Sequence, residues 1–288
     1  MSSTKTPASN TGVTFPAPPT FDAGTVRFDW MQATVAADPL VLSDSLAELL
    51  GAEQENARGL NGYASSKILK RDGETLARVN YGGGNGNPNV VASGAATDDF
   101  VPVLRAGWGD HQVTRFDSAS DFSAPGGFEQ LRAVLLELAG SRRSVEHIES
   151  TKKGVRSRTV YIGASTSQVR VRLYEKGQFE RQKGHDDADA DWFRLEAQIR
   201  PKTYDARRRS SELGPVEAWG QSPFLRQLAA DVLKVDVKPM AMNLRRDPDY
   251  ERALHFLKKQ YGKTLETAMF HEGSWEAVGR LLGIVVAD

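Results

Sequence analysis

The sequence predicts an α+β fold: a largely antiparallel sheet with one polar face, followed by a small helical C-terminal region. Several short segments alternate apolar and charged residues, which is the two-residue period of a strand that has one face in a core. Past Glu212 the spacing of apolar residues becomes helical. We therefore expect a disordered tail, an α+β domain and a helical region over residues 1–20, 21–212 and 213–288, respectively.

The first elements follow from cap and turn signals. Residues 26–35 alternate as a strand, and Asp38, followed by proline, predicts the start of a helix that ends at Gly51. Residues 60–104 are typical of a β-meander with turns. The glycine-rich stretch at 82–89 predicts a hairpin loop, because no GK[ST] follows it as a phosphate-binding P-loop requires.

The later elements follow in the same way. Residues 128–138 form an amphipathic pattern that ends at Gly140, which predicts a helix. Ser222 and Asp247 each precede a proline, and both predict helix starts. Further strands are expected at 113–119, 158–163, 169–175 and 193–200.

The composition excludes several classes of protein. Of the 288 residues, 40% are hydrophobic, which is enough to build a packed core. The chain has no cysteine, so disulfide scaffolds, cysteine nucleophiles and thiolate metal sites are excluded. No apolar run is long enough to span a membrane, and the N-terminus lacks the order of a signal peptide. We therefore expect a cytoplasmic protein without a membrane partner.

The charge is balanced in total but uneven along the chain. Lys and Arg number 37, as do Asp and Glu. Residues 1–60 carry three bases and seven acids, whereas 141–184 carry eleven bases and four acids, and 200–209 add five bases and one acid. This pattern indicates either an anion-binding surface, such as one for nucleic acid, or an ordinary solvated face.

Charged residues lie on one side of each of four predicted strands. If these strands belong to one sheet, their charged sides form one surface, which is either a functional site or the solvent face that antiparallel sheets commonly have. Its members would be Arg27, Asp29, Arg115, Asp117, Arg172, Tyr174, Lys176, Arg194 and Glu196.

These residue types suit phosphoryl transfer. Carboxylates bind Mg²⁺ or Mn²⁺, which polarises a phosphate, while arginines hold its oxygens. Tyrosine can be the nucleophile when a metal, a cation or a base lowers its pKa from about 10. Arg172 and Lys176 lie two positions either side of Tyr174 and could do this. Alternatively, Tyr174 packs against a neighbouring strand without a chemical role.

Other catalytic signatures are absent from the sequence. It has no His-x-His, HExxH or GxSxG. Nicking enzymes that bind metal through a histidine pair, zincins and serine hydrolases of the common type are therefore not matched. The acidic run at 185–191 is expected to be a loop rather than a metal site.

Four blocks occur in a fixed order over roughly residues 25–245: VRFDW, VTRFDSASDF, TVYIGASTSQVRVRLYEKG and WFRLEAQIR. This series resembles the replication initiation factor family of rolling-circle plasmids and filamentous phages. The family pattern is near [VI]-x-R-x-D, Y-x-G-x-x-x-S, R-x-Y-[NDE]-K and R-x-E. The third block is fairly specific, whereas each of the others is weak alone.

The resemblance implies an activity and its residues. Tyr174 would be the nucleophile that nicks and rejoins one origin strand through a phosphotyrosine intermediate, and the polar face would be catalytic. Asp117 and Glu196 would bind a divalent metal, Mg²⁺ or Mn²⁺, with Asp29 as a further candidate. The cations that would contact the phosphate or the nucleophile are Arg172, Lys176 and Arg194.

The resemblance also implies partners. The expected DNA is an origin hairpin, single-stranded at the nick, and further partners are a host helicase, a host polymerase and a second copy in a homodimer, in the bacterial cytoplasm. Ser165 departs from the family, since many members have arginine there, so Arg170 or another base would take over its DNA contact. The predicted DNA-binding residues are Arg115, Arg158, Arg170, Arg194, Arg207 and Arg208.

Two alternatives stay open at this point. One is a catalytically inactive DNA-binding regulator of replication or transcription on the same fold, which would not need Asp117, Tyr174 and Glu196 together. The other is a metal-dependent phosphodiesterase that uses water as its nucleophile. Whether Tyr161 takes the place of Tyr174 is also open.

Overall fold

The computed structural model describes residues 24–240 and 250–283. The chain divides into two compact units, Met1–Met242 and Asn243–Asp288. The predicted tail over residues 1–20 and the predicted helix start at Asp247 lie outside the described residues.

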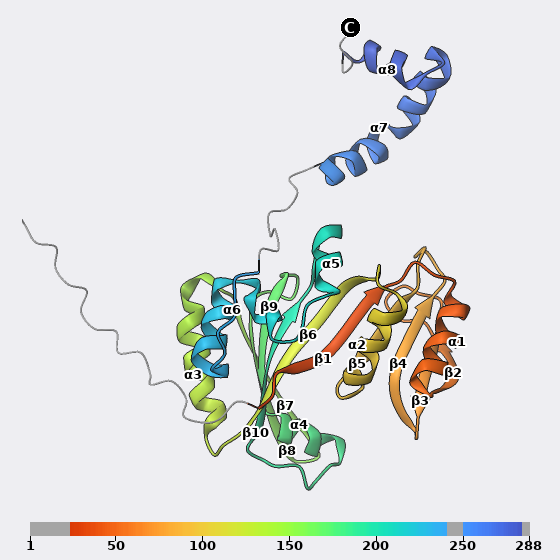
Figure 1. Ribbon diagram of the computed structural model, residues 1–288. Helices are drawn as coiled ribbons and strands as arrows, with labels where there is room; N and C mark the ends of the chain where they lie inside the picture. The colour runs from red at the N-terminus through yellow and green to blue at the C-terminus, as the bar shows by residue number, and fades with distance from the viewer. Residues whose placement is uncertain (1–23, 241–249, 284–288) are drawn as a thin grey trace, which may run out of the picture. The chain divides into compact units, whose positions relative to one another are not determined.

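The first unit contains a ten-stranded sheet in which every neighbouring pair is antiparallel (Figure 1). The order across the sheet is β2-β3-β4-β5-β1-β6-β10-β9-β8-β7, so β1 lies next to β6 and β6 next to β10. The strands are β1 (Arg27–Thr34), β2 (Glu53–Arg58), β3 (Ser65–Arg71), β4 (Glu74–Tyr81), β5 (Asn89–Ser93), β6 (Gln112–Ser123), β7 (Val145–Lys152), β8 (Val155–Ile162), β9 (Val169–Tyr174) and β10 (Trp192–Ile199).

A layer of helices packs against one face of this sheet and encloses the core. The helical elements of the first unit are α1 (Pro39–Leu50), α2 (Ala96–Gly107), α3 (Gly127–Ala139), η1 (Gly140–Arg142), α4 (Lys176–Lys183), α5 (Tyr204–Ser210), η2 (Glu217–Gln221), α6 (Pro223–Leu228) and the π-helical turn η3 (Ala229–Leu233). Apolar residues of α1, α2, α3, η2 and α6 form one continuous buried cluster with the apolar faces of the strands. The predicted α+β class, with a largely antiparallel sheet, is therefore confirmed.

Local signals position several of these helices. The Asp38 side chain accepts hydrogen bonds from the backbone N–H groups of Leu40 and Val41 at 2.9 and 3.1 Å, which satisfies two donors at the start of α1. Gly51 ends that helix in the left-handed conformation, with φ of 60°. Ser222 caps α6 through the backbone N–H of Leu225. The predictions made for these helix ends are confirmed.

The predicted β-meander over 60–104 is correct only in part. Residues 96–107 form α2, in which Thr97, Phe100, Val101 and Leu104 are buried. Those positions follow the three-to-four-residue spacing of a helix face, a signal that the Pro102 inside the helix obscures. The two edge strands, β2 and β7, are not predicted from the sequence, because their residues are mostly exposed and so lack an alternating burial pattern.

The helices over 217–233 belong to the first unit, although the sequence analysis groups them with the C-terminal region. Trp219, Leu225 and Leu228 are fully buried in the core of the sheet unit. The Trp219 indole N–H donates to the Ser118 hydroxyl at 2.9 Å, which fixes η2 to β6.

The second unit contains α7 (Tyr250–Glu272) and α8 (Trp275–Leu281). Ser274 caps α8 by accepting from the backbone N–H of Ala277 at 3.2 Å. Within residues 24–240 and 250–283, no helix combines the length and the apolar character needed to cross a membrane.

Candidate active site

A pocket of about 470 Å³ lies on the sheet face opposite the main helical layer, beside α4. Strand register assembles it. In the antiparallel pair of β9 and β10, Tyr174 lies opposite Arg194, and Arg172 lies opposite Glu196. The pocket is lined by Arg27, Asp29, Trp30, Ser93, Gly94, Ala95, Arg115, Asp117, Arg172, Tyr174, Lys176, Phe179, Glu180, Lys183, Trp192, Arg194 and Glu196. All nine residues of the predicted polar surface therefore meet in one pocket.

A break in the pairing of β1 adds an aromatic residue to this site. The register between β1 and β6 shifts between Phe28 and Trp30, so that Phe28 and Met31 are buried while Asp29 and Trp30 both line the pocket. The Arg115 guanidinium carbon lies 4.7 Å from the centre of the Trp30 ring. Strict alternation predicted Asp29 correctly but placed Trp30 on the opposite face.

Arg194 is the most tightly held cation of the site. It is 3% exposed, its Nη1 donates to Asp29 Oδ1 at 2.5 Å, and its Nε and Nη2 donate to the two carboxylate oxygens of Asp121 at 2.6 and 2.8 Å. Asp121 also accepts from Arg27 and from the Trp192 indole. Burial would raise the pKa of Asp121, but the hydrogen bonds and charge of Arg194 outweigh it and hold that pKa below its usual value.

Asp121 is absent from the polar surface that the sequence predicts. The predicted strand over residues 113–119 stops short of it, whereas β6 continues to Ser123. Asp121 lies on the same side as Arg115 and Asp117 at the two-residue period, so continuing the alternation by one step would have found it.

Asp117 forms a two-point ion pair with Arg115. Arg115 Nε and Nη2 donate to the two carboxylate oxygens at 2.9 and 2.5 Å. Asp117 is buried, and this burial raises its pKa even though Arg115 acts in the opposite direction. Among the predicted metal ligands, Asp117 is therefore already occupied by a neighbouring cation.

Glu196 has a free acceptor atom in the pocket. Glu196 is 1% exposed, and one of its carboxylate oxygens lies 3.5 Å from Arg172 Nη1. The other oxygen, Oε1, is buried without a hydrogen-bond partner. Burial, together with the negative charges of Asp29 and Asp117, raises the pKa of Glu196 to about 7 against the opposing charge of Arg172.

The raised pKa of Glu196 predicts how stability depends on pH. A carboxyl group whose pKa rises on folding, here from 4.5 to about 7, stabilises the fold at low pH and loses that contribution as the pH rises through this interval. The unfolding free energy of Glu196→Gln minus that of wild type should therefore be larger at pH 8 than at pH 5 by about 2–3 kcal/mol. Urea unfolding of both proteins in EDTA at the two pH values measures this, and an unchanged difference would contradict it.

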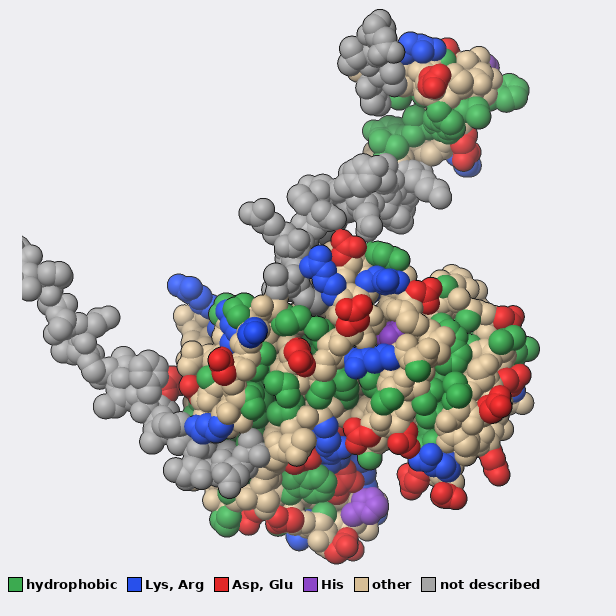
Figure 2. Space-filling model, viewed as in Figure 1, with side chains coloured by type: hydrophobic (Ala, Val, Ile, Leu, Met, Phe, Trp, Pro, Cys, Tyr) green, Lys and Arg blue, Asp and Glu red, His purple; other side chains and the backbone are tan. Residues whose placement is uncertain are grey.

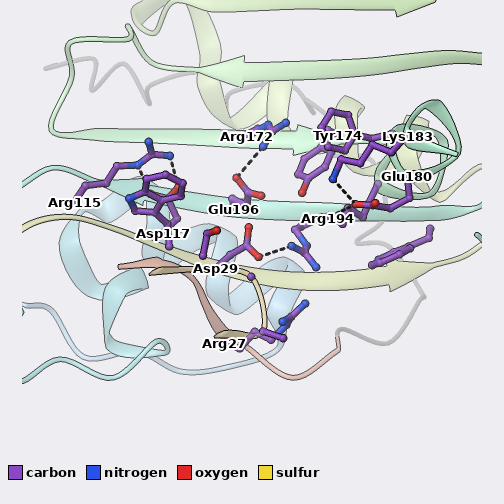
Figure 3. A pocket seen from close by; sticks show the side chains of 17 residues that line it. Arg27, Asp29, Arg115, Asp117, Arg172, Tyr174, Glu180, Lys183, Arg194 and Glu196 are labelled. Carbon is purple, nitrogen blue, oxygen red and sulfur yellow. Dashed lines mark hydrogen bonds and ion pairs between the residues drawn. The ribbon is translucent and has the colours of Figure 1, made fainter. Parts of the chain in front are cut away.

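Tyr174 points from β9 into the pocket, with its hydroxyl directed toward Glu196 and Arg194 (Figure 3). It is 3% exposed, the Arg172 guanidinium carbon lies 3.8 Å from its ring centre, and Phe179 packs edge-on at 6.0 Å. Burial and the charge of Glu196 raise the pKa of Tyr174, while Arg194 and Arg172 act to lower it. Neutralising Glu196 would therefore make the phenol more acidic.

Lys176 reaches the pocket from a helix rather than from a strand. β9 ends at Tyr174, and Lys176 is the first residue of α4, where its ammonium pairs with Glu180. The strand prediction that extended one face through Lys176 is therefore wrong, although Lys176 does line the site. Gly177 allows this arrangement, because a Cβ there would lie 1.7 Å from the carbonyl oxygen of Asp189.

The remaining predicted DNA-binding residues lie outside the pocket. Arg158 faces the other side of the sheet, where it pairs with Glu175 and stacks on Phe128 at 4.7 Å. Arg170 lies further along β9 and stacks on Tyr161 at 3.6 Å. Arg207 and Arg208 are on α5, where Figure 2 shows basic and acidic side chains together.

The carboxylates of the pocket have the residue types of a divalent-metal site but are paired with arginines. Among the described residues, no group of three or more His, Asp or Glu side chains is arranged to hold a metal ion. Asp29, Asp117 and Glu196 each point at an arginine (Figure 3). Glu196 nevertheless keeps one unpartnered buried oxygen, and its pKa is raised by burial and further by the two neighbouring acids. A divalent cation would bind that free oxygen and reduce the repulsion between the carboxylates, so the residue types fit a metal site.

Comparison with known proteins finds a similarity in structure. No protein-family model matches the sequence, and no curated protein matches it. The chain is similar in structure to a rolling circle replication initiator protein from Geobacillus stearothermophilus, with 20% sequence identity and a TM-score of 0.49. The alignment covers 75% of this chain and 100% of the other.

Proposed function

We propose that the protein is a rolling-circle replication initiator that nicks and rejoins one DNA strand at an origin through a phosphotyrosine intermediate. The observation that carries the proposal is the single pocket in which Tyr174 meets arginines and acidic side chains drawn from β1, β6, β9 and β10. A set of this kind is suited to phosphoryl transfer, because it combines a nucleophile with groups that hold and polarise a phosphate.

The charge of the pocket favours an anionic substrate. Its lining holds six cationic side chains, Arg27, Arg115, Arg172, Lys176, Lys183 and Arg194, and four acidic ones, Asp29, Asp117, Glu180 and Glu196. Aromatic side chains line the same space and can stack on unpaired bases, which suits a single strand better than a duplex. The aromatic residues are Trp30, Tyr174, Phe179 and Trp192.

The reaction is a pair of reversible phosphoryl transfers. The Tyr174 oxygen forms a bond to phosphorus as the bond from phosphorus to the 3′ oxygen breaks. The phenol loses a proton and the 3′ oxygen gains one, so charge is conserved. The free 3′-OH can be extended, and the phosphotyrosyl bond keeps the energy needed for rejoining.

The side chains have separate parts in this scheme. Arg172 and Lys176, beside Tyr174, would hold the phosphate and favour the phenolate. Arg194 would position Asp29 and face the nucleophile across the β9–β10 pair. Glu196, with Asp29 or Asp117, would hold Mg²⁺ or Mn²⁺, which supplies Lewis-acid polarisation of the scissile phosphate when bound.

The direct test is a covalent adduct. The full chain is incubated with supercoiled plasmid and with single-stranded oligonucleotides from its own replicon, in Mg²⁺, in Mn²⁺ or in EDTA. We expect a protein–DNA adduct on denaturing gels, only with metal, and mass spectrometry of the adduct should place the nucleotide on Tyr174. Nicked DNA with free ends and no adduct would instead indicate a water nucleophile.

A second candidate is a DNA-binding regulator without nuclease activity on the same fold. It is favoured by the burial of Tyr174 and by the occupation of Asp117 by Arg115. Specific origin binding with neither nicks nor adduct in any metal would support it.

We further propose an origin hairpin as the DNA, a host helicase and polymerase as partners, and a homodimer in the bacterial cytoplasm.

A further inference from the structure

Arg200 is a cation on the pocket side of the sheet that lacks a carboxylate partner in the part of the chain that the structure describes. It directly follows β10 and continues the alternation that places Arg194, Glu196 and Gln198 on the polar face. Its backbone N–H donates to the Gln168 carbonyl at 2.7 Å, which fixes the position of the main chain. Within residues 24–240 and 250–283 its side chain forms no ion pair, and Nη1 is buried without a hydrogen-bond partner.

The side-chain contact that Arg200 does make is weak. Its Nη2 donates to the Gln198 amide oxygen at 3.4 Å, near the limit for a hydrogen bond. Burial lowers the pKa of Arg200, and so does repulsion from Arg115 and Arg170, whereas Asp117 acts in the opposite direction. The side chain is thus half-buried among like charges, an arrangement that a bound anion would stabilise.

Two more arginines border the same region, next to Tyr161 of β8. Arg170 stacks on the Tyr161 ring at 3.6 Å, and Arg172 lies 5.9 Å from the same ring. The Nε of Arg172 is also buried without a partner. Arg170 pairs with Glu146, which is exposed and therefore easily exchanged for another anion.

We propose that Arg200 and Arg170 form a second phosphate subsite, which binds the backbone of the single DNA strand beyond Arg172 and the scissile phosphate. The guanidinium fork suits phosphate because two parallel N–H groups can bind two of its oxygens. The proposal rests on the proposed function for the identity of the ligand, since the same cations would also attract free phosphate. Tyr161 then acts as the platform that orients Arg170 rather than as a nucleophile, and it does not line the catalytic pocket.

The spacing of the two subsites limits the length of DNA between them. Tyr174 and Arg170 lie four residues apart on β9, which corresponds to about 13 Å of strand. A stacked DNA strand advances about 3.4 Å per nucleotide, so about four stacked nucleotides, or fewer extended ones, span that distance. A strand of about ten nucleotides can occupy both subsites, whereas a dinucleotide, which has a single phosphate, cannot.

The test compares wild type with Arg200→Gln, Arg200→Lys and Arg132→Gln, all as full chains in EDTA so that no strand is cut. Arg132→Gln is the matched control, because it removes one positive charge from α3 on the other side of the sheet. Fluorescence anisotropy measures binding of a thymidine strand of about ten nucleotides and, as the short strand, of the thymidine dinucleotide. A methylphosphonate strand of the longer length, which has the same bases without backbone charge, completes a double-mutant cycle.

We expect Arg200→Gln to weaken binding of the long phosphate strand about tenfold, which is the usual effect of losing hydrogen bonds to a charged group. Its slope of log affinity against log salt should fall by about one. The methylphosphonate strand and the short strand should lose no more than about twofold. Arg200→Lys should recover part of the affinity, and Arg132→Gln should behave as wild type.

Equal losses for the phosphate and methylphosphonate strands, or for Arg200→Gln and Arg132→Gln, would overturn the subsite. Thermal unfolding of each variant shows whether a loss of binding comes from misfolding. If Arg200→Gln is misfolded, the binding of Arg200→Lys alone decides whether the subsite exists. If inorganic phosphate at matched ionic strength stabilises wild type but the long strand shows no dependence on Arg200, the site binds free phosphate and the assignment to DNA is wrong. If a covalent adduct forms but strand binding does not depend on Arg200, only the subsite is refuted. If strand binding depends on Arg200 but no adduct forms, only the nicking reaction is refuted.

Discussion

Tyr174→Phe should bind single-stranded origin DNA with wild-type affinity, form no covalent adduct and lose nicking by about 10³-fold or more. The substitution removes one oxygen atom and keeps the ring that packs against Phe179 and Arg172. Without the phenolic oxygen no phosphotyrosyl bond can form, while the arginines and carboxylates that hold the strand remain. Gel assays of supercoiled plasmid relaxation and anisotropy with a labelled strand measure the two effects separately.

Tyr161→Phe is the matched control for this experiment. Tyr161 lies on the neighbouring strand β8, opposite Arg172, and does not line the pocket. Its phenyl ring can still stack under Arg170 without the hydroxyl. We expect nicking to be unchanged in this variant. If Tyr174→Phe keeps full nicking activity and Tyr161→Phe loses it, the nucleophile is Tyr161 on β8 and our proposal is wrong.

Arg194→Ala should destabilise the protein by about 3–5 kcal/mol, the usual result when a buried ion pair loses one partner. The truncation leaves the carboxylates of Asp29 and Asp121 without the guanidinium that now binds both. Because β1, β6 and β10 meet at this arginine, the loss should be visible as a lower midpoint of urea unfolding with little change in slope.

Two comparisons isolate the cause of that loss. Arg27→Ala removes another arginine from Asp121, but one that makes a single contact at 3.1 Å and is 30% exposed, so it should cost less than about 1 kcal/mol. Lowering the pH should reduce the penalty of Arg194→Ala, because protonation removes the charge left on Asp121. A penalty as small as that of Arg27→Ala would show that the network contributes little to stability.

The sequence predicts much of this protein because the relevant signals are local. Alternation with a two-residue period identified the polar faces of β6, β9 and β10, since a strand turns successive side chains to opposite sides whatever it pairs with. Asp38 and Gly51 marked the ends of α1 because capping needs only a few neighbouring residues. The signals failed where the chain departs from regular geometry, as at the β1 register shift that brings Trp30 to the site.

The sequence by itself determined which chemical groups are available and which side of each strand carries them. Only the tertiary structure decided that Arg194 binds Asp29, which is 165 positions away, and that Asp121 rather than Asp117 is its second partner. Strand order and register settle such pairs, and they depend on how the whole apolar face packs against its helices. On the polar face, the side chains that these strands and α4 bring together bury Glu196 and Tyr174, which raises their pKa values in a way that no local pattern reveals.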